Sequence, residues 1–149
     1  HLLLTLDDLM GEAPCPHLHC KPCLKCARDR DALLEAVLRE SAPGGRGRVF
    51  FGSDSAPHPR EAKECARPAS GIYSSPCAVA ALAGRFEAEG ALGSLESFLS
   101  RSGAAFYGLP PPRGRLVLER EAWTVPAEAD GAVPMLAGER LEWRTVKVP

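Results

Sequence analysis

The sequence predicts an α/β fold, in which helices and strands alternate along the chain. Apolar residues recur near helical spacing over 29–40, and a second helical stretch runs from Pro76 to about Glu89. Between them, residues 48–52 are β-branched and aromatic and have glycine on both sides, which is typical of a buried strand. The order helix, strand, loop, helix is the order of a parallel α/β fold.

Length and composition are ordinary for a globular protein. The chain has 149 residues, of which 45% are hydrophobic and 25% are charged. A formal net charge of -1 argues against a general nucleic-acid binder, which would carry a basic surplus. The longest apolar runs are far too short to span a bilayer. We therefore expect neither nucleic acid nor a membrane as a partner.

The cysteines indicate a reducing compartment. Four of the six crowd together between Cys15 and Cys26, whereas a disulfide-rich scaffold spreads its cysteines to staple its loops. We expect free thiols and a protein of the cytoplasm, with an organelle as the alternative.

Turn signals divide the first half of the chain. A short apolar run over 1–5 has the character of a strand end, and residues 7–16 form a loop. Asp29 or Asp31 can cap the helix over 29–40, which Pro43 and the glycines after it bring to an end.

In the second half, Ser74 or Ser75 is expected to cap the helix that starts at Pro76, and Gly90 to stop it. Another helix is predicted over 95–101, stopped by Gly103. Three alternating segments then predict short strands, at 116–118, 123–125 and 141–143.

These elements make about one and a half βα units, which are too few to close a sheet or a barrel. The chain also begins with His1 and has no initiator Met. We therefore expect the 149 residues to be a piece of a longer chain, so that the absence of a targeting peptide carries no information about compartment.

The residues that can carry chemistry follow the predicted strand. Asp54 comes directly after it, where α/β barrels and open sheets place their reactive groups. A carboxylate there can bind a divalent metal and exchange a proton with a metal-bound water. His58 follows Pro57, which stiffens the turn, and can contact an anionic substrate or a metal. Spacing alone equally permits a turn-capping aspartate and a surface histidine.

The surrounding string is more specific. Phe-Phe-Gly-Ser-Asp-Ser-Ala-Pro-His over 50–58, followed by Lys63-Glu64, resembles the eighth-strand motif of the single-function dihydroorotases of bacteria, fungi and plants. His-Leu-His-Cys-Lys-Pro-Cys-Leu-Lys over 17–25 is similar to that family's His-Leu-Tyr-Cys-Leu-Pro-Ile-Leu-Lys segment. Residues 106–110 and 134–139 resemble its C-terminal landmarks, and the likeness runs through the whole chain in order.

The resemblance implies the C-terminal part of an amidohydrolase-type (β/α)8 TIM barrel. Residues 1–109 would belong to the barrel, with its last strand at about 48–52, the catalytic loop at 53–75 and helices at about 76–101. Residues 110–149 would form a C-terminal β extension. The family interconverts N-carbamoyl-L-aspartate and L-dihydroorotate in pyrimidine biosynthesis, uses two zinc ions, and is expected to work as a homodimer.

By the same resemblance, Asp54 binds one metal and acts as the general acid/base. His58 aligns with a histidine that binds the substrate carboxylate. Lys21 aligns with a leucine whose backbone contacts the pyrimidine ring, and Ser70 aligns with a small residue that contacts the substrate. The family's other metal ligands have no counterpart in this sequence, so the isolated chain is expected to be inactive.

A rival interpretation concerns the cysteines and histidines between residues 15 and 26. Their density, with Cys20, Cys23 and Cys26 at regular spacing, also suggests a small zinc-stabilised binding module. A second, properly separated Cys/His pair is absent from the sequence, which argues against such a module.

Overall fold

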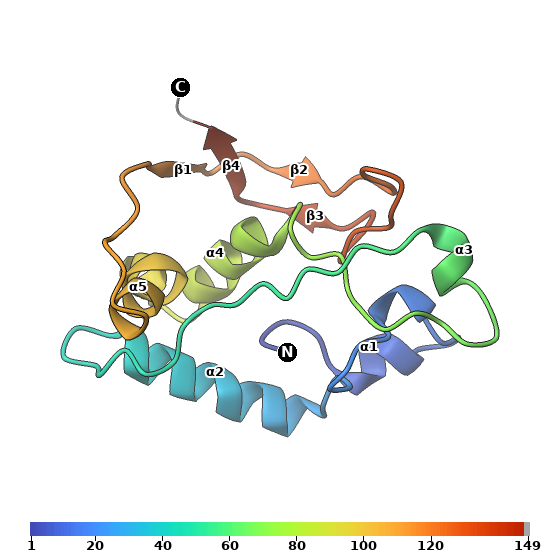
Figure 1. Ribbon diagram of the computed structural model, residues 1–149, viewed down its shortest axis with the longest axis horizontal. Coiled ribbons are helices and arrows are strands. Elements are labelled where there is room, and N and C mark those ends of the chain that lie inside the picture. The colour runs from blue at the N-terminus through green and yellow to red at the C-terminus, as the bar shows by residue number, and fades with distance from the viewer. Residues whose placement is uncertain (148–149) are drawn as a thin grey trace.

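The computed structural model describes residues 1–147, in which helices form most of the regular structure and short strands lie towards the C-terminal end (Figure 1). The helical elements are α1 (Leu6–Met10), η1 (Pro16–Leu18), α2 (Ala27–Ser41), α3 (Arg60–Lys63), α4 (Ala78–Ala88), η2 (Leu92–Ser94), η3 (Ser97–Arg101) and α5 (Ser102–Phe106). The strands are β1 (Leu116–Glu119), β2 (Trp123–Thr124), β3 (Arg140–Leu141) and β4 (Arg144–Lys147).

The first predicted helix is confirmed as α2, which runs along one edge of the molecule (Figure 1). It buries Leu34 and Val37, whose spacing of three residues puts both on one face. The predicted caps are wrong, because the helix starts before Asp29 and Asp31 and has Cys26 at the N-cap position. Asp29 instead lies in the first turn, where its carboxylate accepts a hydrogen bond from the Cys26 thiol at 3.3 Å and faces the positive end of the helix dipole.

The second predicted helix is confirmed as α4, again with a different cap. Cys77 occupies the N-cap position, and Gly90 follows the helix with a φ of 66°. Ser74 and Ser75 lie outside the N-cap position, and the Ser74 hydroxyl donates to the Ser53 carbonyl at 3.2 Å. The backbone amides of Ser74 and Ser75 donate to the Ser55 hydroxyl at 3.1 and 3.0 Å. The serines are thus used to hold the loop that contains Asp54.

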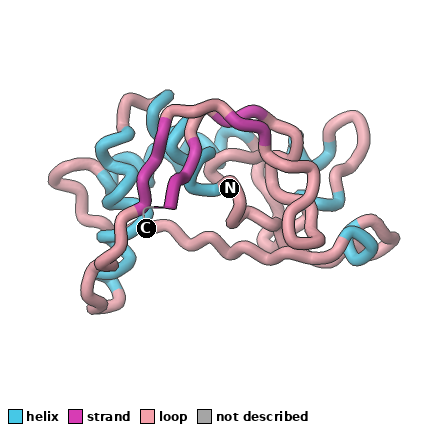
Figure 2. Tube along the Cα trace, turned by 90° about the horizontal axis from the view of Figure 1, so that it is seen from above, coloured by secondary structure: helices cyan, strands magenta, loops and turns pink. Residues whose placement is uncertain are grey.

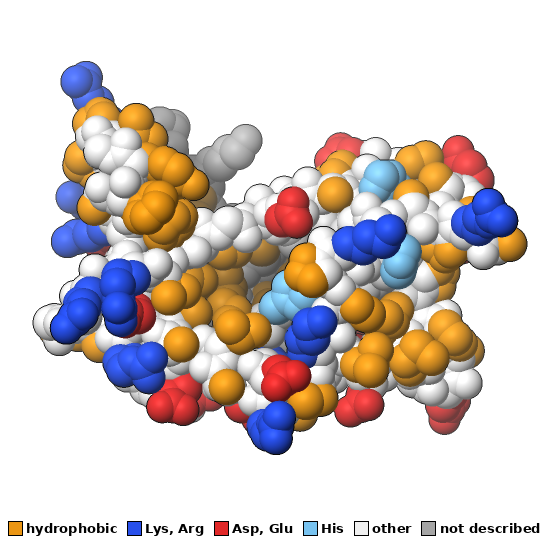
Figure 3. Space-filling view, turned by 60° about the horizontal axis from the view of Figure 1, so that its bottom comes forward, with side chains coloured by type: hydrophobic (Ala, Val, Ile, Leu, Met, Phe, Trp, Pro, Cys, Tyr) orange, Lys and Arg blue, Asp and Glu red, His pale blue; other side chains and the backbone are white. Residues whose placement is uncertain are grey.

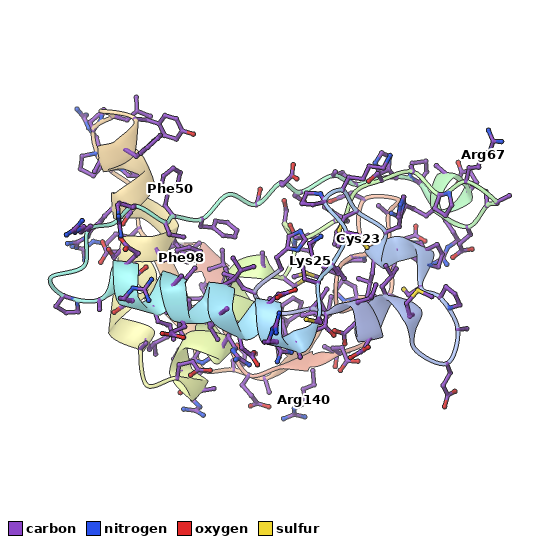
Figure 4. All side chains as sticks on the ribbon, turned by 90° about the horizontal axis from the view of Figure 1, so that it is seen from below. Cys23, Lys25, Phe50, Arg67, Phe98 and Arg140 are labelled. Carbon is purple, nitrogen blue, oxygen red and sulfur yellow. The ribbon has the colours of Figure 1, made fainter. Side chains whose placement is uncertain are left out.

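Gly103 does not stop the third helix as predicted. A helical stretch continues over 92–106, and Gly103 lies inside it. A Cβ atom at Gly103 would stand 3.2 Å from the Phe50 ring, so glycine lets that ring pack closely on α5 (Figure 4). Gly108, with a φ of 63°, follows the end of the stretch.

The buried strand predicted over 48–52 is not formed. This segment is a loop that crosses the molecule (Figure 2), and Val49, Phe50 and Phe51 are only half-buried. The Phe51 amide donates to the Phe98 carbonyl at 2.9 Å, which is a bond to a helical segment. A strand needs the backbone groups of a neighbouring strand, and the described residues place none beside this segment.

Two antiparallel pairs, β1 with β4 and β2 with β3, form near the C-terminus. The strands predicted near 116–118 and 123–125 occur as β1 and β2. The strand predicted over 141–143 is wrong in its bounds, because Glu142 and Trp143 connect β3 to β4. Trp143 fixes these strands on α4, since its indole N–H donates to the Glu87 carboxylate at 3.0 Å.

Two hydrophobic clusters form the core. One joins α2, α4 and the helical stretch after α4, and the other joins the N-terminal segment to the C-terminal loops. Their buried members are Val37, Leu82, Ala83, Phe86, Leu95 and Phe98 in the first, and Leu4, Leu9, Leu24, Cys77, Val125 and Met135 in the second. Within residues 1–147 the result is a small α/β structure with no closed barrel. None of the helices in this range combines the length and the apolar character that crossing a membrane requires.

Candidate functional site

Asp54 lies on an exposed loop whose backbone is held in an uncommon conformation. Its φ is 42°, in the left-handed region that few residues other than glycine, asparagine and aspartate adopt. The flanking residues are fixed to the segment before α4, because the Ser74 hydroxyl donates to the Ser53 carbonyl at 3.2 Å and the Ala56 amide donates to the Ile72 carbonyl at 3.0 Å. An unusual backbone held by its surroundings is a feature of functional loops.

His58 and Ser70 are brought together directly. His58 Nε2 lies 3.1 Å from the Ser70 carbonyl oxygen, and because that oxygen can only accept, Nε2 carries the hydrogen. Glycine at position 71 allows the loop of His58 to lie this close to the loop of Ser70. A Cβ atom at Gly71 would stand 2.6 Å from Ala56 Cβ and 3.0 Å from His58 Nε2, and its φ of 151° also favours glycine.

The side chain of Lys21 is exposed, but the loop that contains Lys21 contacts the loop of Ser70. The Gly71 amide donates to the carbonyl of His19 at 2.9 Å, which joins the loop of Lys21 to the loop of Ser70. Histidine side chains gather on one half of the face seen in Figure 3. Three of the four predicted site residues therefore lie on segments that are hydrogen-bonded to one another at Gly71.

Sequence reasoning gave no role to Lys63, which lies at the centre of this network. The side chain is 2% exposed, and its ammonium donates to the carbonyls of His19, Ala69 and Gly71 at 3.0, 2.8 and 2.7 Å. Burial lowers the pKa of the Lys63 ammonium below its usual value. The sequence held no signal of this burial, because lysine is among the residues most often exposed.

The residues present do not build a metal site on their own. Within residues 1–147, no three side chains of His, Cys, Asp or Glu are grouped so that they could hold a metal ion. Asp54 thus stands as a single carboxylate, which does not suffice for a zinc pair. The same finding does not favour the zinc module between residues 15 and 26, where Cys26 is exposed and free. Cys23 is likewise exposed and free (Figure 4).

A shallow, mainly apolar pocket of about 690 Å³ lies beside this network. Its wall includes Cys15, His19 and Glu64. The Glu64 carboxylate lies 2.9 Å from His17 Nε2, and hydrogen bonding from His17 lowers the pKa of Glu64. None of the four predicted site residues lines this pocket, so the candidate site is the open surface around Asp54 and His58.

No protein-family model matches the chain. Among curated proteins, it is 48% identical over 148 residues to a dihydroorotase of Halorhodospira halophila, covering 97% of this chain and 41% of that protein. It is 42% identical over 147 residues to the mitochondrial dihydroorotase of Oryza sativa subsp. japonica, covering 96% of this chain and 35% of the relative.

Solved structures give the same likeness. The dihydroorotase of Saccharomyces cerevisiae in complex with 5-fluoroorotic acid superposes with a TM-score of 0.85 at 32% identity, over 100% of this chain and 42% of that one. The dihydroorotase of Campylobacter jejuni gives a TM-score of 0.80 at 36% identity, over 98% of this chain and 42% of that one. The chain thus spans about two fifths of the length of the relatives that it matches.

Proposed function

Because the chain resembles dihydroorotases in sequence and in fold over about two fifths of their length, we propose that it supplies the proton-transfer and substrate-binding side of a dihydroorotase active site. The complete enzyme would be a TIM-barrel amidohydrolase of which this chain is the C-terminal part. It would interconvert N-carbamoyl-L-aspartate and L-dihydroorotate in pyrimidine biosynthesis. The observation that carries this proposal is the Asp54 loop, whose left-handed backbone presents an exposed carboxylate four residues before His58 in the chain.

Asp54 is the proposed general acid/base. During hydrolysis of the cyclic amide, its carboxylate accepts the proton of the hydroxyl group that attacks the ring carbonyl carbon. It then gives this proton to the ring nitrogen as the C–N bond breaks, so that the open-chain product carries a new carboxylate and a neutral nitrogen. The exposure of Asp54 leaves its carboxylate free to meet both atoms in turn.

His58, Ser70 and Lys21 are the proposed substrate contacts. The substrate is a pyrimidine ring that bears a carboxylate, and a histidine N–H can donate to that group. The yeast relative was solved with 5-fluoroorotic acid, which has the same combination of ring and carboxylate. Ser70 and Lys21 lie on the two loops joined at Gly71, where backbone groups can meet the ring.

Two zinc ions belong to the proposed complete enzyme, with Asp54 as one ligand. The other ligands would have to come from residues outside these 149, because residues 1–147 offer no metal-binding group. We therefore expect the isolated chain neither to hold the zinc pair tightly nor to hydrolyse dihydroorotate. Turnover by the isolated chain supplied with zinc would contradict this expectation.

The proposal is tested by a chimera in which this chain replaces the 148 aligned residues of the Halorhodospira halophila dihydroorotase. The expected result is turnover of L-dihydroorotate within about tenfold of the parent enzyme. A second chimera, in which only residues 48–75 are exchanged, covers the case in which the larger exchange disturbs folding. The proposal is wrong if a chimera that folds is inactive.

We also propose that the complete enzyme is a homodimer of the cytoplasm. Free thiols support a reducing compartment, and the rice relative is named mitochondrial, which keeps an organelle as the alternative. Light scattering of the active chimera tests the dimer, and a monomeric mass at full activity would contradict it.

A further inference from the structure

Lys63 is the most deeply buried charged side chain that the structure describes. It is 2% exposed, although it ends the short helix α3 on an otherwise exposed loop. Within residues 1–147, no carboxylate lies within ion-pair distance of its ammonium. The neighbouring Glu64 pairs with His17 and Arg60 instead. A buried ammonium with no counter-ion is unusual, because burying a charge is costly unless other groups compensate it.

Three backbone carbonyls compensate this charge. An ammonium has three N–H donors, and the carbonyls of His19, Ala69 and Gly71 accept one hydrogen bond each at 2.7 to 3.0 Å. The His19 carbonyl also accepts the Gly71 amide at 2.9 Å. The Lys63 side chain therefore ties two loops together, at positions that are far apart in the sequence.

These carbonyls lie next to the proposed substrate contacts. Ser70 stands between Ala69 and Gly71, and Lys21 is two residues beyond His19. The Ser70 carbonyl in turn accepts the hydrogen bond from His58. A shift of either loop would thus move all three groups that are proposed to meet the substrate.

Asp54 is held by other bonds. Its neighbours Ser53 and Ser55 are fixed by Ser74 and Ser75, and Ala56 is fixed by the Ile72 carbonyl, with no bond from Lys63 among them. Loss of the Lys63 ammonium should therefore disturb the substrate-binding loops more than the proton-transferring carboxylate.

We propose that Lys63 is a positioning residue for substrate binding in the dihydroorotase reaction. Its ammonium holds the loops of Lys21 and Ser70 in a fixed position relative to each other. This inference rests on the proposed function. Ground-state contacts that persist in the transition state contribute to KM and leave kcat unchanged. Removing the ammonium should then raise KM selectively. A lysine with a merely structural role would instead reduce the amount of folded enzyme, which lowers the apparent kcat at constant KM.

The test compares Lys63→Met with Lys25→Met in the active chimera. Methionine keeps most of the length of the side chain and removes the ammonium, and Lys25 is an exposed lysine on the loop before α2 whose side chain makes no hydrogen bond in the described residues (Figure 4). For Lys63→Met we expect KM for L-dihydroorotate to rise about tenfold or more, with kcat per folded active site within about twofold. Lys25→Met should match the parent chimera in both constants.

A second measurement covers the case in which Lys63→Met folds poorly. Lys63→Arg keeps a cation and should recover part of the substrate affinity, and titration of folded sites with 5-fluoroorotic acid gives affinity without turnover. An unchanged KM in Lys63→Met, or a fall of kcat alone, would overturn the positioning role while leaving the proposed function intact. An inactive parent chimera would overturn both.

Discussion

His58 Nε2 donates a hydrogen bond to the backbone carbonyl of Ser70 across 3.1 Å. With this donor engaged, the remaining ring nitrogen, Nδ1, is the one that can meet a substrate carboxylate, and it donates only when it also carries a hydrogen. The bond between His58 and Ser70 therefore leaves the imidazole with one nitrogen that holds a loop and one that is available for the proposed contact with the substrate.

This division predicts different effects of two amide substitutions at His58. The asparagine amide lies near the position of Nδ1, and the glutamine amide lies near that of Nε2. In the chimera, His58→Gln should keep the bond to Ser70 and raise KM for dihydroorotate about tenfold. His58→Asn should have the lower KM of the two variants. Equal KM values for His58→Gln and the parent would contradict the assignment.

Gly71 should tolerate no side chain. The Cβ atom of Gly71→Ala would stand 2.6 Å from Ala56 Cβ and 2.9 Å from the Ala56 carbonyl oxygen, which is closer than real contacts allow. We expect a loss of about 1–3 kcal/mol in the free energy of unfolding, measured by denaturant titration of the chain. Gly93→Ala is the matched control, because nothing lies within 4 Å of its Cβ position. Equal stability of the two variants would show that the loops do not meet at Gly71.

Glu40 should make the chain sensitive to acid. The Arg48 guanidinium donates to both carboxylate oxygens, and this hydrogen bonding lowers the pKa of Glu40 to about 2. The folded-state pKa lies below the ordinary value of 4.5. The contribution of Glu40 to stability is therefore complete above pH 4.5 and is lost as the pH falls from 4.5 towards 2.

The measurement is the melting temperature of the parent chain and of two variants at several pH values between 6 and 3. Glu40→Gln should melt lower than the parent at pH 6, and the difference should shrink at pH 3. Glu35→Gln, on an exposed position of the same helix, should change little at either pH. A constant difference for Glu40→Gln across this range would contradict the ionic role of the carboxylate.

Cys77 should be the least reactive thiol. It is 1% exposed, burial raises its pKa to about 11, and its Sγ lies 2.9 Å from the Met135 carbonyl oxygen. Alkylation by iodoacetamide at pH 8, followed by peptide mass spectrometry, should label the exposed Cys23 and Cys65 first and Cys77 only after unfolding. Early labelling of Cys77 in the folded chain would place it outside the core.

The helices were predicted from the sequence more accurately than the buried strand over 48–52. The periodicity around Leu34 and Val37 is a local property, so α2 appeared where it was expected. The strand at 48–52 depends on neighbouring strands, which local pattern cannot supply and which the described residues do not contain. Gly103 illustrates the same limit, because its role is set by the Phe50 ring from a distant segment.

The candidate site shows a similar division. Asp54 and His58 were predicted from the motif over 50–58 and Ser70 from its aligned position, and the structure brings His58 and Ser70 into contact. The link to the loop of Lys21 through Lys63 could not be predicted, because it uses backbone carbonyls, which carry no sequence signature. The residues that carry the proposed chemistry can thus be predicted from short stretches of sequence. The hydrogen bonds that join their loops come from distant parts of the chain and cannot.

The most direct test of the proposed function is kcat of the Asp54→Asn chimera. Asparagine tolerates the left-handed backbone and removes the titrating carboxylate, so kcat should fall about 100-fold or more. Asp130→Asn is the matched control, because Asp130 is also exposed and also has a left-handed φ, of 50°. It should keep the activity of the parent chimera. A kcat of Asp54→Asn within a few fold of the parent would contradict the assignment of Asp54 as the proton-transferring group.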